Sequence, residues 1–202
     1  TGAGKTTMAN LISRFYDIQE GRIFIDDYDL KKVSIESLRQ QMGVMTQDNF
    51  LFSGTIRDNI RYGRLDATDE QIVAAAKAVN AHDFIMELDD GYDTVLSERG
   101  GGLSIGQKQL LAFARTMVSD PRILILDEAT SSIDTNTEIL VQEGIEHLLA
   151  GRTSFVIAHR LSTIQKADRI FVIDDGRIIE EGNARQLLEK KGFYYDLYMS
   201  QF

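Results

Sequence analysis

The first residues of the chain form a pattern that is typical of phosphate binding. Residues 2–6 read Gly-Ala-Gly-Lys-Thr, which matches the end of the motif G-x-x-x-x-G-K-[ST]. Small residues let backbone N–H groups close around phosphate oxygens. The Lys5 ammonium would reach the β- and γ-phosphates of a nucleotide, and the Thr6 hydroxyl would ligate Mg²⁺. An ordinary glycine turn before a helix is the competing explanation, and the amphipathic stretch that follows GAGKTT favours the phosphate site.

Two adjacent carboxylates follow a short, strongly apolar stretch. Asp127 and Glu128 come directly after residues 123–126, which read ILIL and have the length of a buried strand. In open α/β sheets, ligands bind beyond the carboxyl ends of the strands. We therefore expect Asp127 to hold Mg²⁺ through water. We expect Glu128 to be a general base that polarises an attacking water, a role that contributes about 10²–10⁴-fold to a rate. The alternative is that one carboxylate only caps the next helix.

Gln47 and His159 also follow apolar stretches, GVMTQ and SFVIAH. A single Gln or His is often structural, but both are predicted to lie at the sheet edge that the phosphate loop shares. We expect Gln47 to contact Mg²⁺ or the attacking water and His159 to reach the γ-phosphate.

The segment 103–107, LSIGQ, predicts a helix start that suits an anion. Ser104 and Gln107 satisfy the S-x-x-Q capping box. The amino end of a helix presents unpaired N–H groups and the positive end of the helix dipole. Spacing alone does not distinguish a well-capped helix from a phosphate contact, so both interpretations stand at this point.

The elements that would position these residues alternate between strands and helices. We predict helices at 4–16, through most of 56–118, at 136–149 and from 184, and strands at 21–27, 43–47, 123–127, 154–158 and 170–174, the last turning back at residues 175–176. Short apolar strands that alternate with helices indicate a parallel sheet covered on both faces. We predict two lobes, an α/β core at 1–52 and 121–202 and a helical insertion at about 53–120.

Composition limits the class of protein. The chain has 202 residues, 43% of them hydrophobic, which is enough for a real core. Its formal net charge of −9 disfavours nonspecific nucleic-acid binding. It has no cysteine, which excludes disulfides and zinc–thiolate sites. No apolar run approaches the roughly 20 residues of a bilayer-spanning helix. Because the chain starts inside a motif and without a signal-peptide pattern, we expect it to be a fragment of a longer polypeptide.

In combination, the motifs carry a family resemblance. The order GAGKTT, Gln47, LSIGQ, ILILDEAT, SSID and IAHR resembles the ATP-binding cassette (ABC) ATPases over essentially the whole chain. The resemblance implies an α/β fold of the P-loop NTPase (RecA-like) type, with a mostly parallel sheet and an inserted α-helical subdomain that carries the signature LSIGQ. Residues 52–60 and 97–100 are similar to segments of exporter cassettes.

The resemblance also implies ligands and partners. ATP and Mg²⁺ would bind, and two cassettes, identical or different, would close head-to-tail around two ATP molecules. Transmembrane domains would meet segment 97–100 and the groove near Gln47 at the cytoplasmic face of a bacterial plasma membrane, and no nucleic-acid partner is expected. The implied nucleotide contacts are Gly2, Ala3, Gly4, Lys5, Thr6, Thr7 and Gln47, with Ser104, Gly106, Gln107 and Asp134 contributing across the dimer interface; the implied metal site is Thr6, Gln47 and Asp127, and the implied catalytic residues are Glu128, His159, Lys5 and Gln47.

Two departures from the family pattern affect these expectations. The family's upstream strands and adenine-stacking aromatic are absent, so the fragment alone should bind nucleotide poorly. Ile105 replaces the first glycine of the common signature LSGGQ, and we expect function to persist because Ser104 and Gly106 remain.

The function that we expect is ATP hydrolysis that powers export, and its cargo is not encoded in these residues. The alternatives are a non-transport ABC ATPase of the translation or DNA-repair type and a regulatory, nonhydrolysing cassette. The exporter-like segment 52–60 and the charge of −9 argue against the first alternative, and Glu128 and His159 argue against the second.

Overall fold

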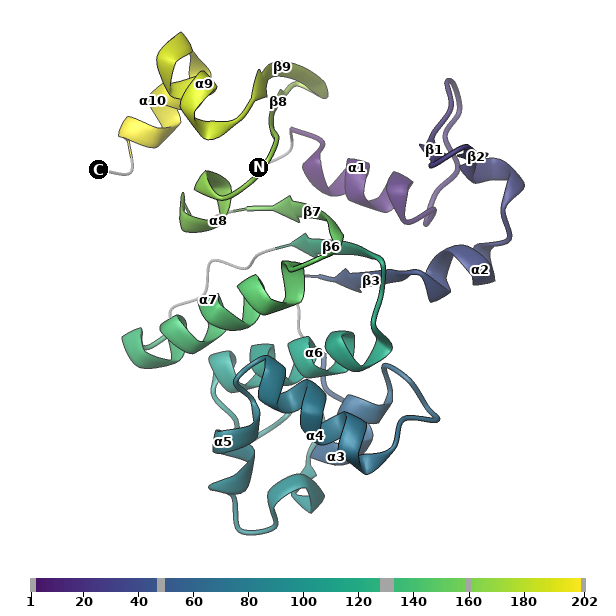
Figure 1. The fold of residues 1–202 in the computed structure, drawn as a ribbon, viewed down its shortest axis with the longest axis vertical. Coiled ribbons are helices and arrows are strands. Elements are labelled where there is room, and N and C mark those ends of the chain that lie inside the picture. The colour runs from purple at the N-terminus through teal and green to yellow at the C-terminus, as the bar shows by residue number, and fades with distance from the viewer. Residues whose placement is uncertain (1–2, 47–49, 128–132, 159–160, 201–202) are drawn as a thin grey trace. The chain divides into compact units, whose positions relative to one another are not determined.

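The computed structural model describes residues 3–46, 50–127, 133–158 and 161–200. The chain, drawn as a ribbon in Figure 1, divides by its internal contacts into two compact units, each built from separate stretches of sequence. Unit 1 comprises residues 1–38, 126–130 and 156–202, and unit 2 comprises residues 39–125 and 131–155. The segment 53–120, predicted to be a helical lobe, falls entirely within unit 2.

The amino-terminal part of unit 1 has shorter elements than the sequence predicts. Helix α1 (Lys5–Ile12) ends before residue 16, because Arg14 adopts a left-handed φ of 52°. The Arg14 guanidinium then donates to the carbonyls of Leu30 (3.0 Å) and Val33 (2.7 Å). The expected strand at 21–27 is reduced to β1 (Phe24–Ile25), paired with β2 (Tyr28–Asp29), because Asp26 turns the chain at φ 51°. The 3₁₀ helix η1 (Leu30–Lys32) and helix α2 (Ile35–Gln40) follow.

The carboxy-terminal part of unit 1 is a hairpin packed against two helices. Strands β8 (Ile170–Asp174) and β9 (Arg177–Gly182) pair antiparallel, with Asp174 opposite Arg177, so the predicted two-residue turn at 175–176 is confirmed. Helices α9 (Ala184–Lys190) and α10 (Phe193–Met199) follow, and the short α8 (Leu161–Gln165) precedes the hairpin. Buried Val172, Leu187 and Tyr194 join β8, α9 and α10 in one apolar core.

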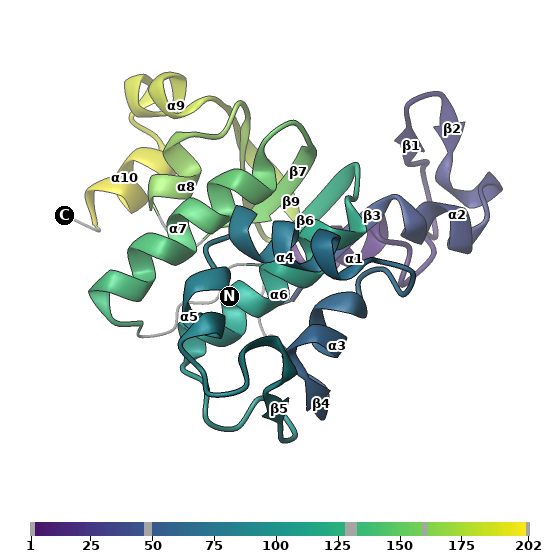
Figure 2. The same cartoon turned by 60° about the horizontal axis from the view of Figure 1, so that its bottom comes forward.

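Unit 2 is mainly helical and is organised around its longest helices. Helix α6 (Ile105–Ser119) packs against α3 (Ile56–Arg61), α4 (Asp69–Ala78) and α7 (Thr135–Leu149), as Figure 2 also shows. The smaller elements are β4 (Gly54–Thr55), α5 (His82–Met86), η2 (Gly91–Asp93) and β5 (Val95–Leu96). The capping box expected at the start of α6 is present, and α4 begins with a second one, formed by Thr68 and Gln71.

A three-stranded sheet carries the strands that precede the predicted catalytic residues. Its order is β3 (Met42–Met45), β6 (Ile123–Asp127) and β7 (Thr153–Ile157). The three strands run in the same direction in Figure 1, as expected for a parallel sheet. The middle of β6 is fully buried, which explains its uninterrupted apolar sequence.

Candidate functional site

The backbone at the predicted phosphate loop has the conformation of an anion-binding helix start. Gly4 is the N-cap of α1 with φ 100° and ψ 4°, a region that residues with a Cβ rarely adopt. No side chain caps the helix and no acidic residue lies in its first turn. Lys5, Thr6 and Thr7 occupy that turn, with both threonines exposed. The first N–H groups of α1, which have no acceptor within the helix, are thus suited to phosphate oxygens.

Asp127 lies at the carboxyl end of β6, as the sequence predicts. Its side chain is partly exposed, whereas the three preceding residues are buried. A buried strand that ends in a solvent-accessible carboxylate can offer oxygen ligands to a cation.

The structure does not describe Gly2, Gln47, Glu128 or His159. The strands that lead to the last three of these residues are described, however. Strand β3 ends two residues before Gln47, β6 ends directly before Glu128, and β7 ends two residues before His159. Strands β3, β6 and β7 lie side by side in one sheet. Gln47, Glu128 and His159 therefore each follow the end of one of three neighbouring strands.

In unit 2, the segment 104–107 forms a complete capping box. The Gln107 N–H donates to Ser104 Oγ (3.2 Å), and the Ser104 N–H donates to Gln107 Oε1 (2.9 Å). The cap therefore uses the N–H of the third helical residue and leaves those of Ile105 and Gly106 without an acceptor in the helix. Capping and anion binding are consequently compatible here. The Ile105 side chain is 52% exposed at the first helical position.

The amino ends of α6 and α7 lie in direct contact. A Cβ built at Gly106 would be only 2.2 Å from Thr137 Cγ2 and 3.1 Å from Ile133 Cγ2, so this packing requires a glycine. Asp134 is the N-cap of α7, and its Oδ1 accepts the Thr137 N–H at 2.9 Å. Hydrogen bonding from the Thr137 backbone N–H is the largest cause that holds the pKa of Asp134 below its ordinary value. The structure thus brings the predicted interface residues Gly106 and Asp134 into one region.

One polar cluster in unit 2 was missed by the sequence analysis. The Arg115 guanidinium donates to Asn59 O (2.8 Å), Asn59 Oδ1 (2.9 Å) and Phe50 O (2.8 Å). Asn59 is only 2% exposed, accepts the Phe52 N–H at 2.9 Å and donates to Phe52 O at 2.9 Å. Burial lowers the pKa of Arg115. Its guanidinium carbon lies 5.3 Å from the Phe52 ring centre and 5.8 Å from that of Tyr62.

This cluster fixes residues 50–52, the described segment that follows Gln47, to helices α3 and α6. The rings of Phe50, Phe52 and Tyr62 remain exposed in part and contact one another in sequence, with centroids 5.1 Å and 4.5 Å apart. Periodicity could not reveal the cluster, because it depends on hydrogen bonds between Asn59 and Arg115, which are 56 residues apart in the chain.

Comparison with known proteins finds the same family that the sequence motifs resemble. Residues 1–131 match the family model described as ABC transporter. Over all 202 residues the chain is 58% identical to the uncharacterized ABC transporter ATP-binding protein YfiC of Bacillus subtilis (strain 168), and it covers 33% of that protein. It is 52% identical over 202 residues to the ATP-dependent lipid A-core flippase of Syntrophus aciditrophicus (strain SB), of which it covers 34%.

A solved structure is also similar. A bacterial Atm1-family ABC exporter with ATP bound matches 100% of the chain with a TM-score of 0.91 and 47% sequence identity, and the chain covers 35% of it. The chain therefore spans about a third of the length of these relatives.

Proposed function

Because the chain belongs to the ABC transporter family, we propose that it is the nucleotide-binding domain of an exporter. It binds ATP, and hydrolysis of that ATP powers export of a substrate through transmembrane domains. The observation that carries this proposal is the start of α1, where Gly4 at φ 100° precedes Lys5 and two exposed threonines. The similarity to an exporter that was solved with ATP bound supports it.

The phosphate loop binds the nucleotide by geometry and charge. Backbone N–H groups at the start of α1 donate to phosphate oxygens, and the Lys5 ammonium balances their negative charge. Thr6 and Asp127 fit Mg²⁺, because each offers an oxygen and neither is buried. Among the described residues, no group of three or more His, Asp or Glu could hold a metal, so phosphate and water oxygens would complete the coordination. Bound Mg²⁺ supplies positive charge to the β- and γ-phosphates.

Hydrolysis is a transfer of the γ-phosphoryl group to water. The water oxygen forms a bond to the γ-phosphorus, the bond from phosphorus to the β–γ bridging oxygen breaks, and ADP leaves. We assign Glu128 as the base that takes the water proton, Gln47 as the residue that positions the water, and His159 as a contact of the γ-phosphate. The positions where β3, β6 and β7 end support this assignment.

A second cassette completes each ATP site in this proposal. Ser104, Gly106 and Gln107 contact the γ-phosphate bound by the partner cassette, and Asp134 lies at the interface between the two. The N–H groups at the start of α6 that lack a helical acceptor support the contact. Exposed Ile105 occupies the first helical position and leaves the Gly106 N–H in place. The partner cassette is either a second copy of this chain or a related one.

Transmembrane domains are the other proposed partner, and they would place the chain at the cytoplasmic face of a membrane. In the part of the chain that the structure describes, no helix has the length and apolar character needed to cross a bilayer. The relatives are about three times longer than this chain. Segment 97–100 and the exposed rings of Phe50, Phe52 and Tyr62 after Gln47 form the proposed contact surface.

The substitution Glu128→Gln in the full-length protein tests the proposed hydrolysis. We expect it to retain ATP binding and to lower phosphate release by a factor on the order of 10² or more, because a positioned base is lost. Lys5→Ala is the control that should lose ATP binding itself. Near-normal phosphate release from Glu128→Gln would sink the assignment of the base.

A further inference from the structure

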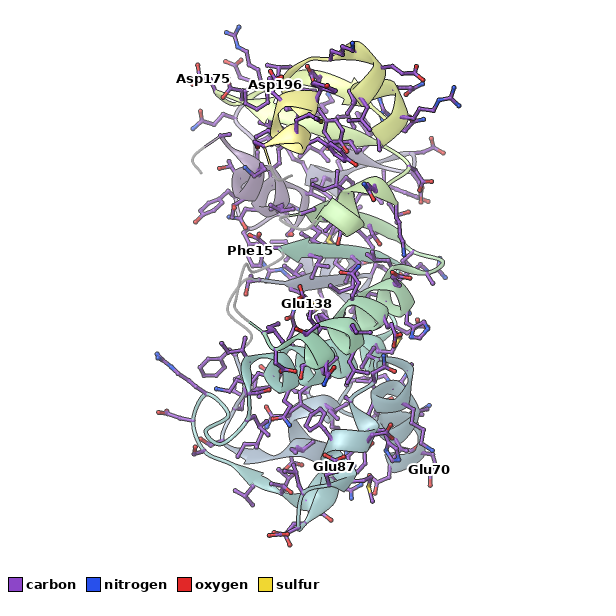
Figure 3. The ribbon with its side chains drawn as sticks, turned by 90° about the vertical axis from the view of Figure 1, so that its left-hand side faces the viewer. Phe15, Glu70, Glu87, Glu138, Asp175 and Asp196 are labelled. Atoms are coloured by element: carbon purple, nitrogen blue, oxygen red, sulfur yellow. The ribbon has the colours of Figure 1, made fainter. Side chains whose placement is uncertain are left out.

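The tip of the β8–β9 hairpin contacts the proposed phosphate loop, and both belong to unit 1. The Gly176 N–H donates to the carbonyl of Ala3 at 3.1 Å. A Cβ built at Gly4 would be 3.6 Å from Gly176 Cα, so the hairpin turn lies close beside the Gly4 backbone. The turn that makes this contact consists of Asp175 (φ 44°) and Gly176 (φ 71°), both left-handed as in a tight two-residue hairpin turn. Figure 3 labels Asp175 at this tip.

This contact orients the Ala3–Gly4 peptide. In a trans peptide the C=O and N–H point in opposite directions. Because the Ala3 carbonyl is held by Gly176, the Gly4 N–H points away from the hairpin. The next carbonyl, that of Gly4, accepts the Met8 N–H at 3.0 Å within α1. The carbonyls of Ala3 and Gly4 therefore both point away from the side on which the N–H groups face an anion. This matters because a carbonyl oxygen on that side would repel phosphate.

The hairpin is itself firmly anchored by the carboxy-terminal helices. The Glu180 carboxylate on β9 accepts the N–H groups of Phe193 (2.7 Å) and Tyr194 (2.9 Å) at the start of α10. Val172 on β8 is buried with Leu187 and Tyr194. Because these contacts fix the strands, they also fix the position of the turn.

We propose that the turn formed by Asp175 and Gly176 is a positioning element of the nucleotide site, which preorganises the phosphate loop for a polyphosphate. This inference rests on the proposed function, since it takes residues 3–7 as part of the site of ATP. The turn touches the loop backbone and acts through it. Preorganisation raises affinity because the loop does not have to be ordered on binding.

An insertion in the full-length protein separates this role from general stability. One glycine inserted between Asp175 and Gly176 lengthens the loop to three residues, which a hairpin accommodates, but it moves the N–H away from Ala3. The matched control is one glycine inserted between Asp26 and Asp27, the two-residue turn of β1–β2 in the same unit. The quantity measured is the dissociation constant for MgATP, with adenosine, which lacks phosphates, as the comparison ligand.

We expect the insertion at 175–176 to weaken MgATP binding by about five- to tenfold, which is the size of one lost hydrogen bond. Adenosine binding should stay within about twofold, and so should MgATP binding to the control. Equal MgATP affinity in both variants, or an equal loss for MgATP and adenosine, overturns the inference. If instead the wild-type protein does not bind MgATP, the proposed function itself is wrong.

Hydrogen exchange of the unaltered protein provides a second test that does not depend on the folding of a variant. The Gly176 amide should exchange more slowly with saturating MgATP than without it, because binding orders its acceptor. Adenosine should leave the rate unchanged, and in Lys5→Ala MgATP should also leave it unchanged. The same Gly176 exchange rate with and without MgATP in the wild-type protein contradicts the proposal.

Discussion

The substitution Gly106→Ala tests the close packing between the amino ends of α6 and α7. The new methyl group would stand 2.2 Å from Thr137 Cγ2. That is more than 1 Å inside the ~3.5 Å at which two carbon atoms meet favourably. Overpacking of this kind costs about 1–3 kcal/mol. The better helix propensity of alanine returns at most about 1 kcal/mol. We therefore expect the two helix ends to be destabilised by about 1–2 kcal/mol.

Thr137→Ser provides the matching partner in a double-mutant cycle, because it removes the Cγ2 methyl that the new Cβ meets. Serine keeps a hydroxyl at this position, and the cap bond, in which the Thr137 backbone N–H donates to Asp134 Oδ1, does not involve the methyl group that the change removes. We expect the double variant Gly106→Ala, Thr137→Ser to recover at least about 1 kcal/mol of the stability that Gly106→Ala loses. This coupling energy exceeds the deviation of about 0.3–0.5 kcal/mol that is found between independent sites.

Hydrogen–deuterium exchange of amides in the first turns of α6 and α7 measures this coupling in the full-length protein, because it reports the free energy of local opening. Exchange in Gly106→Ala should be faster by roughly 5- to 30-fold, the factor that corresponds to 1–2 kcal/mol. Wild-type protection in Gly106→Ala would refute the packing argument. So would losses in Gly106→Ala and Thr137→Ser that simply add in the double variant.

Two further predictions concern polar groups. Asn59→Ala should cost about 2–4 kcal/mol and lower the melting temperature by several degrees, because it leaves the half-buried Phe52 N–H and part of the Arg115 guanidinium without partners. A melting temperature within about 1 °C of wild type would show that the cluster does not stabilise the fold. Because the folded pKa of Asp134 is depressed, its cap stabilises α7 above the unfolded pKa of about 3.9 and is lost as pH falls through the lower folded value. An NMR titration of the Thr137 amide should therefore show a midpoint below 3.9 in wild type and none in Asp134→Asn, and a midpoint at or above 3.9 would contradict the cap.

Features that depend on neighbours in sequence could be predicted. The capping boxes at Thr68 and Ser104 depend on residues three positions apart, so their pattern is visible in the sequence. Strand β6 is uninterrupted by polar residues because both of its faces are buried, and this too can be recognised. The dipeptide Asp-Gly at 175–176 predicts the hairpin turn that the structure shows there.

Features that depend on a single backbone dihedral or on distant contacts could not be predicted. Arg14 and Asp26 end α1 and β1 early by adopting φ values near 50°, and the residue type alone does not determine this conformation. The Asn59–Arg115 cluster requires knowledge of how α3 packs on α6. The contact between Gly176 and Ala3 joins opposite ends of the chain. Gly106 was assigned to phosphate, but its tight contact with Thr137 became evident only from the structure.

We propose that ATP joins the phosphate loop of one cassette to the signature segment of another. Because the chain contains no cysteine, Ala3→Cys and Ser104→Cys would introduce the only thiols within it. Disulfide cross-linking between two cassettes, in the full-length protein with Glu128→Gln, measures this approach directly. We expect a cross-linked product that forms with MgATP and not without it. A product whose yield is independent of MgATP, or no product with MgATP bound, would contradict it.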